Sequence, residues 1–321
     1  MALPESIRSR LTLPAMVAPM FLVSGVDLAA ESCKAGLIGT LTRNHCRTDE
    51  EFEDQLVAVR DRLARARDAA PGLVIGPLAA NISIRNERAM WTKTLEACRR
   101  FDVDLIVTAS GDPTAAAELV HEWGGRIFHD VTSLRFAEKA IGAGVDGVIA
   151  IGAGGGGHSG TLSHLALVPQ IRSIFEGVIV MAGAVGHGAA IRAAEILGAD
   201  LSYLGTRFIA TQESIAPDEY KALLVSQKPT DLIYTRDVNG LPAMWLKESL
   251  RMNDLDPDNL PKAEGHNTNH LPAHVRPWNN LYSAGQGIAF IDDIPHVAEL
   301  AKRLRAEYAA ACTIPVWGKR G

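Results

Sequence analysis

The chain has 321 residues, 47% of them hydrophobic and 21% charged, which predicts a folded protein with a large buried core and argues against disorder. The 32 Lys and Arg residues are outnumbered by 37 Asp and Glu residues, and no basic run occurs, so a nucleic-acid or membrane-surface partner is disfavoured. The four cysteines form no CxxC pair, the N-terminus lacks the apolar core of a signal peptide, and no apolar run is long enough to span a membrane. We therefore expect free thiols and a soluble, cytoplasmic protein.

Short apolar runs alternate with amphipathic stretches along the chain. Eight runs rich in Val, Ile and Leu are apolar at successive positions, as strands covered on both faces are: residues 16–20, 37–41, 73–81, 104–110, 126–131, 147–152, 178–182 and 201–208. Apolar residues recur at helical spacing in residues 50–66, 133–143, 189–197 and 214–225, and Ser133 and Ser214 are candidate N-caps. This α/β alternation predicts a closed (β/α)8 TIM barrel better than an open doubly wound sheet.

Residues 226–285 interrupt the alternation. This segment contains Pro, Asn, Asp and aromatic residues, among them Tyr234, Trp245 and Trp278, without strand signals. We interpret it as a smaller helical lid over the barrel mouth, because its few apolar runs could not sustain a core of their own. The barrel would then comprise residues 1–225 and 286–321, with a terminal helix at residues 292–305.

Glycine-rich segments follow three predicted strands, at the barrel end where active sites of this fold lie. They are residues 152–160 (GAGGGGHSG), 183–188 (GAVGHG) and 205–207 (GTR). Glycine lets a backbone approach a ligand closely, helix N-termini favour phosphate, and the loops after strands 7 and 8 are the customary phosphate site. The placement therefore predicts a phosphorylated cofactor or substrate. The alternative is that these glycines only form tight turns.

Five sequence motifs occur in the order found in the nitronate monooxygenase family, formerly called 2-nitropropane dioxygenases. They are APM at residues 18–20, GGGHSG at 155–160, AG at 182–183, LGTRF at 204–208 and AGQG at 284–287. The sequence resembles this family from about Pro14 to Ala301. The resemblance implies an FMN-binding barrel with a smaller helical part. Related FMN enzymes that share these motifs include enoyl-acyl carrier protein reductases and NADH:quinone reductases.

The resemblance also implies roles for individual residues. Ala18, Pro19 and Met20 would lie against the flavin ring, Asn81 would hydrogen-bond it, and Gly183, Ala184, Gly205 and Thr206 would hold the FMN phosphate. The implied cofactor-binding set also includes Asp130, Gly155, Gly156, Gly157 and Gln286. Three positions depart from the family pattern: Gly154 stands where a Glu is frequent, Ala184 where a Gly is common, and Asp130 where a Lys often follows the histidine of the fifth strand.

His158 is the candidate catalytic residue. It follows four glycines on the loop after the sixth predicted strand, and an imidazole there can remove a proton next to a nitro or carbonyl group or hold the resulting anion. The alternative is a structural histidine held by backbone carbonyls. His187 could cap the following helix or contact the phosphate, and His129 with Asp130 could line the site or form a structural pair. Arg207 could bind the phosphate or form a salt bridge to the lid.

Three further histidines, His266, His270 and His274, recur at four-residue spacing. Pro272 interrupts any helix there and no Cys or acidic cluster accompanies them, so we expect an exposed polar loop and no metal site.

Three functions remain open. The first is an FMN oxygenase that oxidises nitronates or nitroalkanes with dioxygen. The second is an NAD(P)H-dependent FMN reductase of quinones or enoyl thioesters, although no separate dinucleotide-binding GxGxxG unit is found. The third is a flavin-free barrel that binds a phosphorylated metabolite. In each case the ligand is a small molecule, and a homodimer is one open assembly state.

Overall fold

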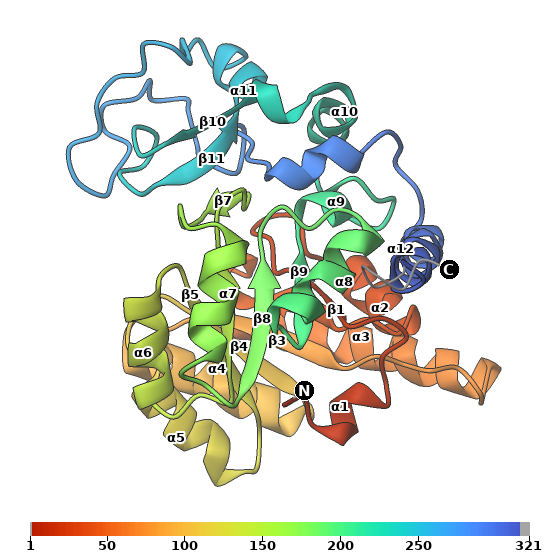
Figure 1. Ribbon diagram of the computed structural model, residues 1–321. Helices are drawn as coiled ribbons and strands as arrows, with labels where there is room; N and C mark the ends of the chain where they lie inside the picture. Colours follow the sequence, from red (N-terminus) through yellow and green to blue (C-terminus); the bar gives the residue numbers. More distant parts are fainter. Residues whose placement is uncertain (1, 315–321) are drawn as a thin grey trace.

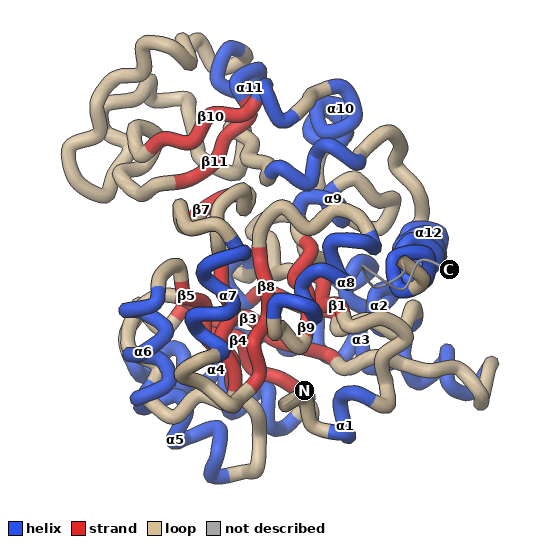
Figure 2. Tube along the Cα trace, in the orientation of Figure 1, coloured by secondary structure: helices blue, strands red, loops and turns tan. Residues whose placement is uncertain are grey.

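The structure is a computed structural model that describes residues 2–314. Eight parallel strands form one sheet in the order β1-β9-β8-β6-β5-β4-β3-β2 (Figures 1 and 2). A parallel bridge between Met16 and Ile38 joins the two ends of this order, so that the sheet closes into a barrel. The strands are β1 Ala15–Val17, β2 Gly39–Thr42, β3 Leu78–Ser83, β4 Leu105–Ala109, β5 Ile127–Val131, β6 Gly147–Ile151, β8 Val178–Ala182 and β9 Leu201–Leu204. The predicted (β/α)8 fold is confirmed.

Strand side chains enter two apolar layers. Alternate residues such as Met16, Leu105 and Phe128 fill the barrel interior, while their neighbours pack against the surrounding helices. Leu3 and Ile7 extend the interior cluster at the end where helix α1 (Glu5–Arg8) lies. This double burial explains why the strand sequences read as continuous apolar runs and not as alternating ones.

Helices connect consecutive strands and form the outer ring (Figure 1). They are α2 Val26–Lys34, α3 Asp49–Ala69, α4 Arg88–Arg100, α5 Thr114–Glu122, α6 Leu134–Gly142, α7 His164–Arg172 and α8 Gly188–Leu197. After the last barrel strand follow α9 Thr206–Ile209, α10 Asp218–Ser226, α11 Lys247–Arg251 and α12 Val297–Cys312, and the 3-10 turns are η1 Arg43–His45, η2 Pro229–Asp231 and η3 Gln286–Phe290. The terminal helix α12 packs against α8 and α2 and completes the ring. Within residues 2–314 no helix is long and apolar enough to cross a membrane.

The predicted helix starts are confirmed in part. Ser133 caps α6, since its hydroxyl accepts a hydrogen bond from the Phe136 amide at 3.3 Å. Ser214 does not cap α10, because that helix begins only after Pro217, and proline disfavours a helical conformation for the residue before it. Residues 205–208, predicted as the end of the eighth strand, instead begin the short helix α9 after Gly205.

The segment 226–285 lies over the carboxyl ends of the barrel strands (Figure 1). It contains two strands that its sequence did not signal, β10 (Leu232–Thr235) and β11 (Ala243–Leu246), which form an antiparallel sheet with β7 (Gly157–His158). It also has an apolar cluster of its own around Trp245, contrary to the expectation from its composition. A second cluster joins Leu246 and Tyr282 to Val23 and Ile209 on the barrel side.

Candidate functional site

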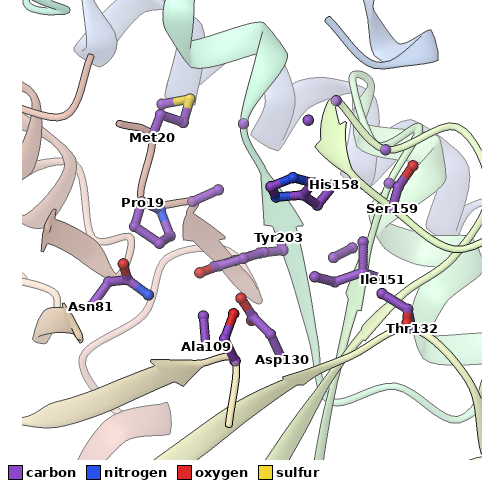
Figure 3. Close-up of a pocket in the computed structure, with 18 of the residues that line it drawn as sticks. Pro19, Met20, Asn81, Ala109, Asp130, Thr132, Ile151, His158, Ser159 and Tyr203 are labelled. Carbon is purple, nitrogen blue, oxygen red and sulfur yellow. The ribbon is translucent and has the colours of Figure 1, made fainter. Parts of the chain in front are cut away.

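A cavity of about 1250 Å³ opens at the carboxyl ends of the barrel strands, beneath the segment 226–285. In Figure 3 Pro19 and Met20 lie on one side and His158 on the other, while Asp130 and Tyr203 form the floor between them. A pocket for a drug-sized ligand is typically ~300–1,000 Å³. The cavity therefore has room for a large cofactor together with a small substrate.

The cavity brings together nearly all residues selected from the sequence. Its lining includes Ala18, Pro19, Met20, Asn81, Asp130, Gly155, Gly156, Gly157, His158, Gly183, Ala184, Gly205 and Thr206. Gln286 is the exception. Its side-chain oxygen lies behind the lining, where a Cβ on Gly154 would approach it to 2.7 Å. A glutamate at position 154 would collide with this amide, so the glycine there fits the position of Gln286.

The glycine loops are held together by backbone contacts. The Gly154 carbonyl accepts hydrogen bonds from the amides of Ala184 at 3.2 Å and Gln286 at 2.8 Å. A Cβ on Gly156 would lie 2.7 Å from the Gly285 nitrogen, and the Gly285 amide donates to the Thr206 hydroxyl at 2.9 Å. Gly154, Gly156 and Gly285 are therefore required for close packing between the loops, and the Ala184 amide is already used within the protein.

Gly205 differs from Gly154, Gly156 and Gly285, where an added Cβ would strike a neighbouring loop. A Cβ added there would meet only Ala18 at 3.5 Å and Met20 at 3.6 Å, which are ordinary contacts, and its φ of −103° suits any residue. The space in front of Gly205 is therefore cavity and not protein. Close approach of a ligand to the backbone is the remaining reason for a glycine at this position.

The start of α8 is not available to a phosphate. His187 caps the helix by accepting from the Ala189 amide at 3.0 Å, and the Glu307 carboxylate accepts from the Gly188 amide at 2.7 Å. Arg207 is buried and pairs with Asp293 at 3.0 Å, so it does not line the cavity. The start of α8 and Arg207 are therefore not available to an anion in the cavity, whose lining includes Arg85, Lys139 and the loops around Gly183 and Gly205.

Two polar groups at the cavity floor lack partners. The Asp130 Oδ1 atom and the Tyr203 hydroxyl are buried and make no hydrogen bond among residues 2–314. Burial raises the pKa of Asp130 to about 7 and, together with the nearby Asp130 carboxyl, raises the pKa of Tyr203 well above its usual value. Buried polar groups are normally paired, so this floor is suited to a polar ligand that supplies the missing hydrogen bonds.

We expect Asp130→Asn to stabilise the protein increasingly as pH rises. The pKa of Asp130 is about 7 in the folded state, above the ordinary value of roughly 3.9 in an unfolded chain. Between about pH 3.9 and pH 7 the Asp130 carboxyl holds its proton in the folded state but loses it in the unfolded state. The free energy of unfolding of the wild type therefore falls as pH rises toward 7. The advantage of the Asn variant should grow by roughly 2 kcal/mol between pH 5 and pH 8, measured by urea unfolding.

Asp112→Asn is the matched control for this pH dependence. Hydrogen bonds from Thr114 lower the pKa of Asp112, so its carboxylate contributes stability above the unfolded pKa, and its loss gives no gain at high pH. An Asp130→Asn advantage that stays constant from pH 5 to pH 8 would show that Asp130 is ionised throughout.

His158 is held from the segment 226–285. Its backbone pairs with Ala243 in the β7–β11 ladder, its Nε2 lies 3.2 Å from the Asn239 Nδ2, and its ring contacts Trp278 edge-on at 5.1 Å. The side chain is exposed to the cavity. Desolvation by surrounding protein atoms, and secondarily the positive charge of Arg85, lower the pKa of His158. The imidazole is therefore favoured in its neutral form at physiological pH.

The remaining candidates divide between the cavity and the framework. His129 lines the cavity, contacts the Thr108 hydroxyl through Nδ1 at 2.8 Å, and has its pKa lowered to about 4, chiefly by burial. Trp278 lines the cavity, whereas Trp245 is fully buried behind it. The Tyr234 hydroxyl donates to the Ser159 carbonyl at 2.7 Å, and His270 contacts the Asp237 carbonyl at 2.9 Å.

Two important residues were missed in the sequence. Tyr203 lies inside the eighth apolar run. There the sequence does not distinguish an aromatic residue that lines the cavity floor from one that is buried in the core. Asn239 lies in the loop between β10 and β11, and the Asn239-Gly240 dipeptide was the signal available for that hairpin.

The fold and the cavity define a (β/α)8-barrel protein with a large ligand site at the carboxyl ends of its strands. The nitronate monooxygenase family model matches residues 8–307. The chain therefore belongs to the nitronate monooxygenase family, a family of flavin-dependent oxidoreductases.

Individual relatives match parts of the chain. It is 29% identical over 235 residues to a nitronate monooxygenase of Neurospora crassa, covering 63% of this chain and 61% of that protein. It is 32% identical over 130 residues to a 5-hydroxy-7a-methyl-1-oxo-octahydro-1H-indene-4-carboxyl-CoA dehydrogenase of Rhodococcus jostii, covering 40% and 36%. The matches thus span less than two thirds of these relatives. The chain is also similar to a nitroalkane oxidase structure from Streptomyces ansochromogenes, with a TM-score of 0.79, 24% identity and coverage of 96% of this chain and 99% of that chain, which is a likeness of fold alone.

Proposed function

We propose that this protein is an FMN-dependent nitronate monooxygenase that oxidises alkyl nitronates or nitroalkanes with dioxygen. The observation that carries the proposal is the cavity itself, in which His158 stands above the polar floor of Asp130 and Tyr203 and which Gly205 also lines. Membership of the nitronate monooxygenase family supports the reaction class.

The cavity residues fit FMN in two respects. The open space before Gly205, in a cavity that Thr206 and the Gly183 loop also line, is suited to the phosphate. The unpartnered Asp130 and Tyr203 groups on the floor, together with Asn81, are suited to the polar edge of the ring. Ala18, Pro19 and Met20 would contact its apolar face.

Bound FMN would supply the electron-transfer and oxygen chemistry of the reaction. The residues of the chain would bind the substrate and manage its charge. His158 would contact the nitro or nitronate group from the cavity rim. Trp278, beside the imidazole, would limit access of water to that group.

We also propose that residues 226–285 act as a lid over this cavity and not as an independent domain. The ladder between β11 and β7 and the apolar cluster shared with Val23 and Ile209 support attachment to the barrel. Four unpaired cysteines support a reducing, cytoplasmic location.

Anaerobic mixing of the purified protein with propyl nitronate, NADH and NADPH in separate experiments tests the reaction class. We expect a yellow protein whose flavin absorbance is bleached by the nitronate and restored by dioxygen. Bleaching by NADH or NADPH alone would identify a reductase instead. A colourless protein that takes up no added FMN would point to the flavin-free barrel.

A further inference from the structure

Asn239 has a fixed side-chain orientation in the loop between β10 and β11. Its Oδ1 atom accepts a hydrogen bond from the Leu241 amide at 3.2 Å, which leaves the Nδ2 group directed at His158. The loop itself is constrained, because Val238 is fully buried and Gly240 has a φ of +79° that favours glycine. The amide cannot be flipped without losing the Leu241 bond.

An amide NH2 group can only donate, so the orientation of Asn239 determines the protonation of the imidazole. The His158 Nε2 atom, 3.2 Å from the Asn239 Nδ2, must then accept and carry no proton. The proton of the neutral ring is consequently on Nδ1. A protonated ring would place an N–H against the amide N–H, which disfavours the imidazolium.

The Nδ1–H group is the part of the ring left for a bound molecule. Among residues 2–314 it makes no hydrogen bond, while His158 lines the cavity and is exposed to it. No carboxylate of the described chain pairs with His158, and Arg85 is the one charged group that influences it. Nothing within residues 2–314 therefore reverses the orientation that Asn239 imposes.

We propose that Asn239 is a positioning residue that fixes His158 as the neutral Nδ1–H tautomer, so that His158 donates a hydrogen bond to an anionic substrate and does not act as a base. The preferred substrate class is then a preformed nitronate, whose oxygens accept the hydrogen bond. A neutral nitroalkane would first have to lose its α-proton to some other group. The substrate part of this inference rests on the proposed function, whereas the tautomer does not.

Nitrogen-15 NMR of the flavin-loaded, histidine-labelled protein tests the tautomer directly. The chain has ten histidines, so a His158→Ala sample identifies the His158 signals. We expect a proton-bearing Nδ1 and a proton-free Nε2 in the wild type. In Asn239→Asp the carboxylate keeps an acceptor for the Leu241 amide but also accepts from His158, so Nε2 should gain a proton and the pKa of His158 should rise.

The substrate preference should change with the tautomer. When the proton moves from Nδ1 to Nε2, the Nδ1 lone pair faces the cavity and can accept the α-proton of a nitroalkane. The ratio of the nitroethane rate to the ethyl nitronate rate should therefore rise roughly tenfold or more in Asn239→Asp. Asn269→Asp makes the same charge change at an exposed position of the same segment and should leave the tautomer and the ratio unchanged.

The outcomes separate the two proposals. A wild-type His158 with a proton on Nε2, or an Asn239→Asp variant with an unchanged tautomer, overturns the positioning role. An unchanged rate ratio with a reversed tautomer overturns the donor role. If the tautomer reverses as expected but no nitro compound reacts with the wild type, the proposed function fails while the positioning of His158 by Asn239 stands.

Discussion

His158→Ala will retain its flavin and its fold but lose roughly 10²–10³-fold in turnover, the usual cost of removing one hydrogen-bond donor to a developing or bound anion. The imidazole is not part of the apolar core, because it is exposed to the cavity. The pairing of β7 with β11 uses only the backbone of His158, so the fold does not depend on the side chain. If His158 donates to the nitronate oxygens, the loss will be similar for ethyl nitronate and nitroethane. If it acted as a base, the preformed nitronate would lose much less. Steady-state oxygen consumption with both substrates measures the difference.

His187→Ala is the matched control for this variant. The same substitution removes an imidazole that caps α8 outside the cavity lining. It should cost about 1 kcal/mol of stability, as the loss of an N-cap usually does, with little change in turnover. Wild-type rates for both substrates in His158→Ala would make His158 structural, and His129 or Asp130 would become the next candidate.

The barrel could be predicted because its signal is local. A strand buried on both faces must be apolar at successive positions, as in 178–182, and the observed β8 has those bounds. The same rule misplaced residues 205–208, because an apolar run does not distinguish the end of a strand from a buried helical turn. Caps were predictable where the serine directly precedes the helix, as at Ser133, and not where a proline delays it, as at Ser214.

The site was predictable only where backbone geometry leaves a mark in the sequence. Glycines are required at Gly156 and Gly285 because a side chain would strike a neighbouring loop, and these motifs carried the resemblance. The contact between Asn239 and His158 joins residues 81 positions apart in the chain, and it depends on the β7–β11 pairing. The unpartnered Tyr203 hydroxyl likewise depends on which strand residues point into the barrel. Neither has a local signal.

Gly205→Leu will release the cofactor while the empty protein remains folded. A Cβ at this position meets only Ala18 and Met20 at ordinary contact distances, and the φ of −103° is open to leucine, so the side chain costs the framework little. It would instead fill the space in front of Gly205 where we place the phosphate. Losing two charge-assisted hydrogen bonds of ~1.5–3 kcal/mol each would raise the Kd for FMN roughly 10²–10⁴-fold.

Fluorescence titration of the flavin-free protein with FMN measures this Kd, and thermal unfolding without FMN measures the fold. Gly72→Leu is the control, because a Cβ at Gly72 meets nothing within 4 Å and the residue lies outside the cavity lining. Added FMN should raise the Tm of the wild type and of Gly72→Leu but not that of Gly205→Leu, since only a ligand that binds the folded state stabilises it. Wild-type affinity in a folded Gly205→Leu variant would remove the phosphate from this position, and the loop around Gly183 would remain as the place for it.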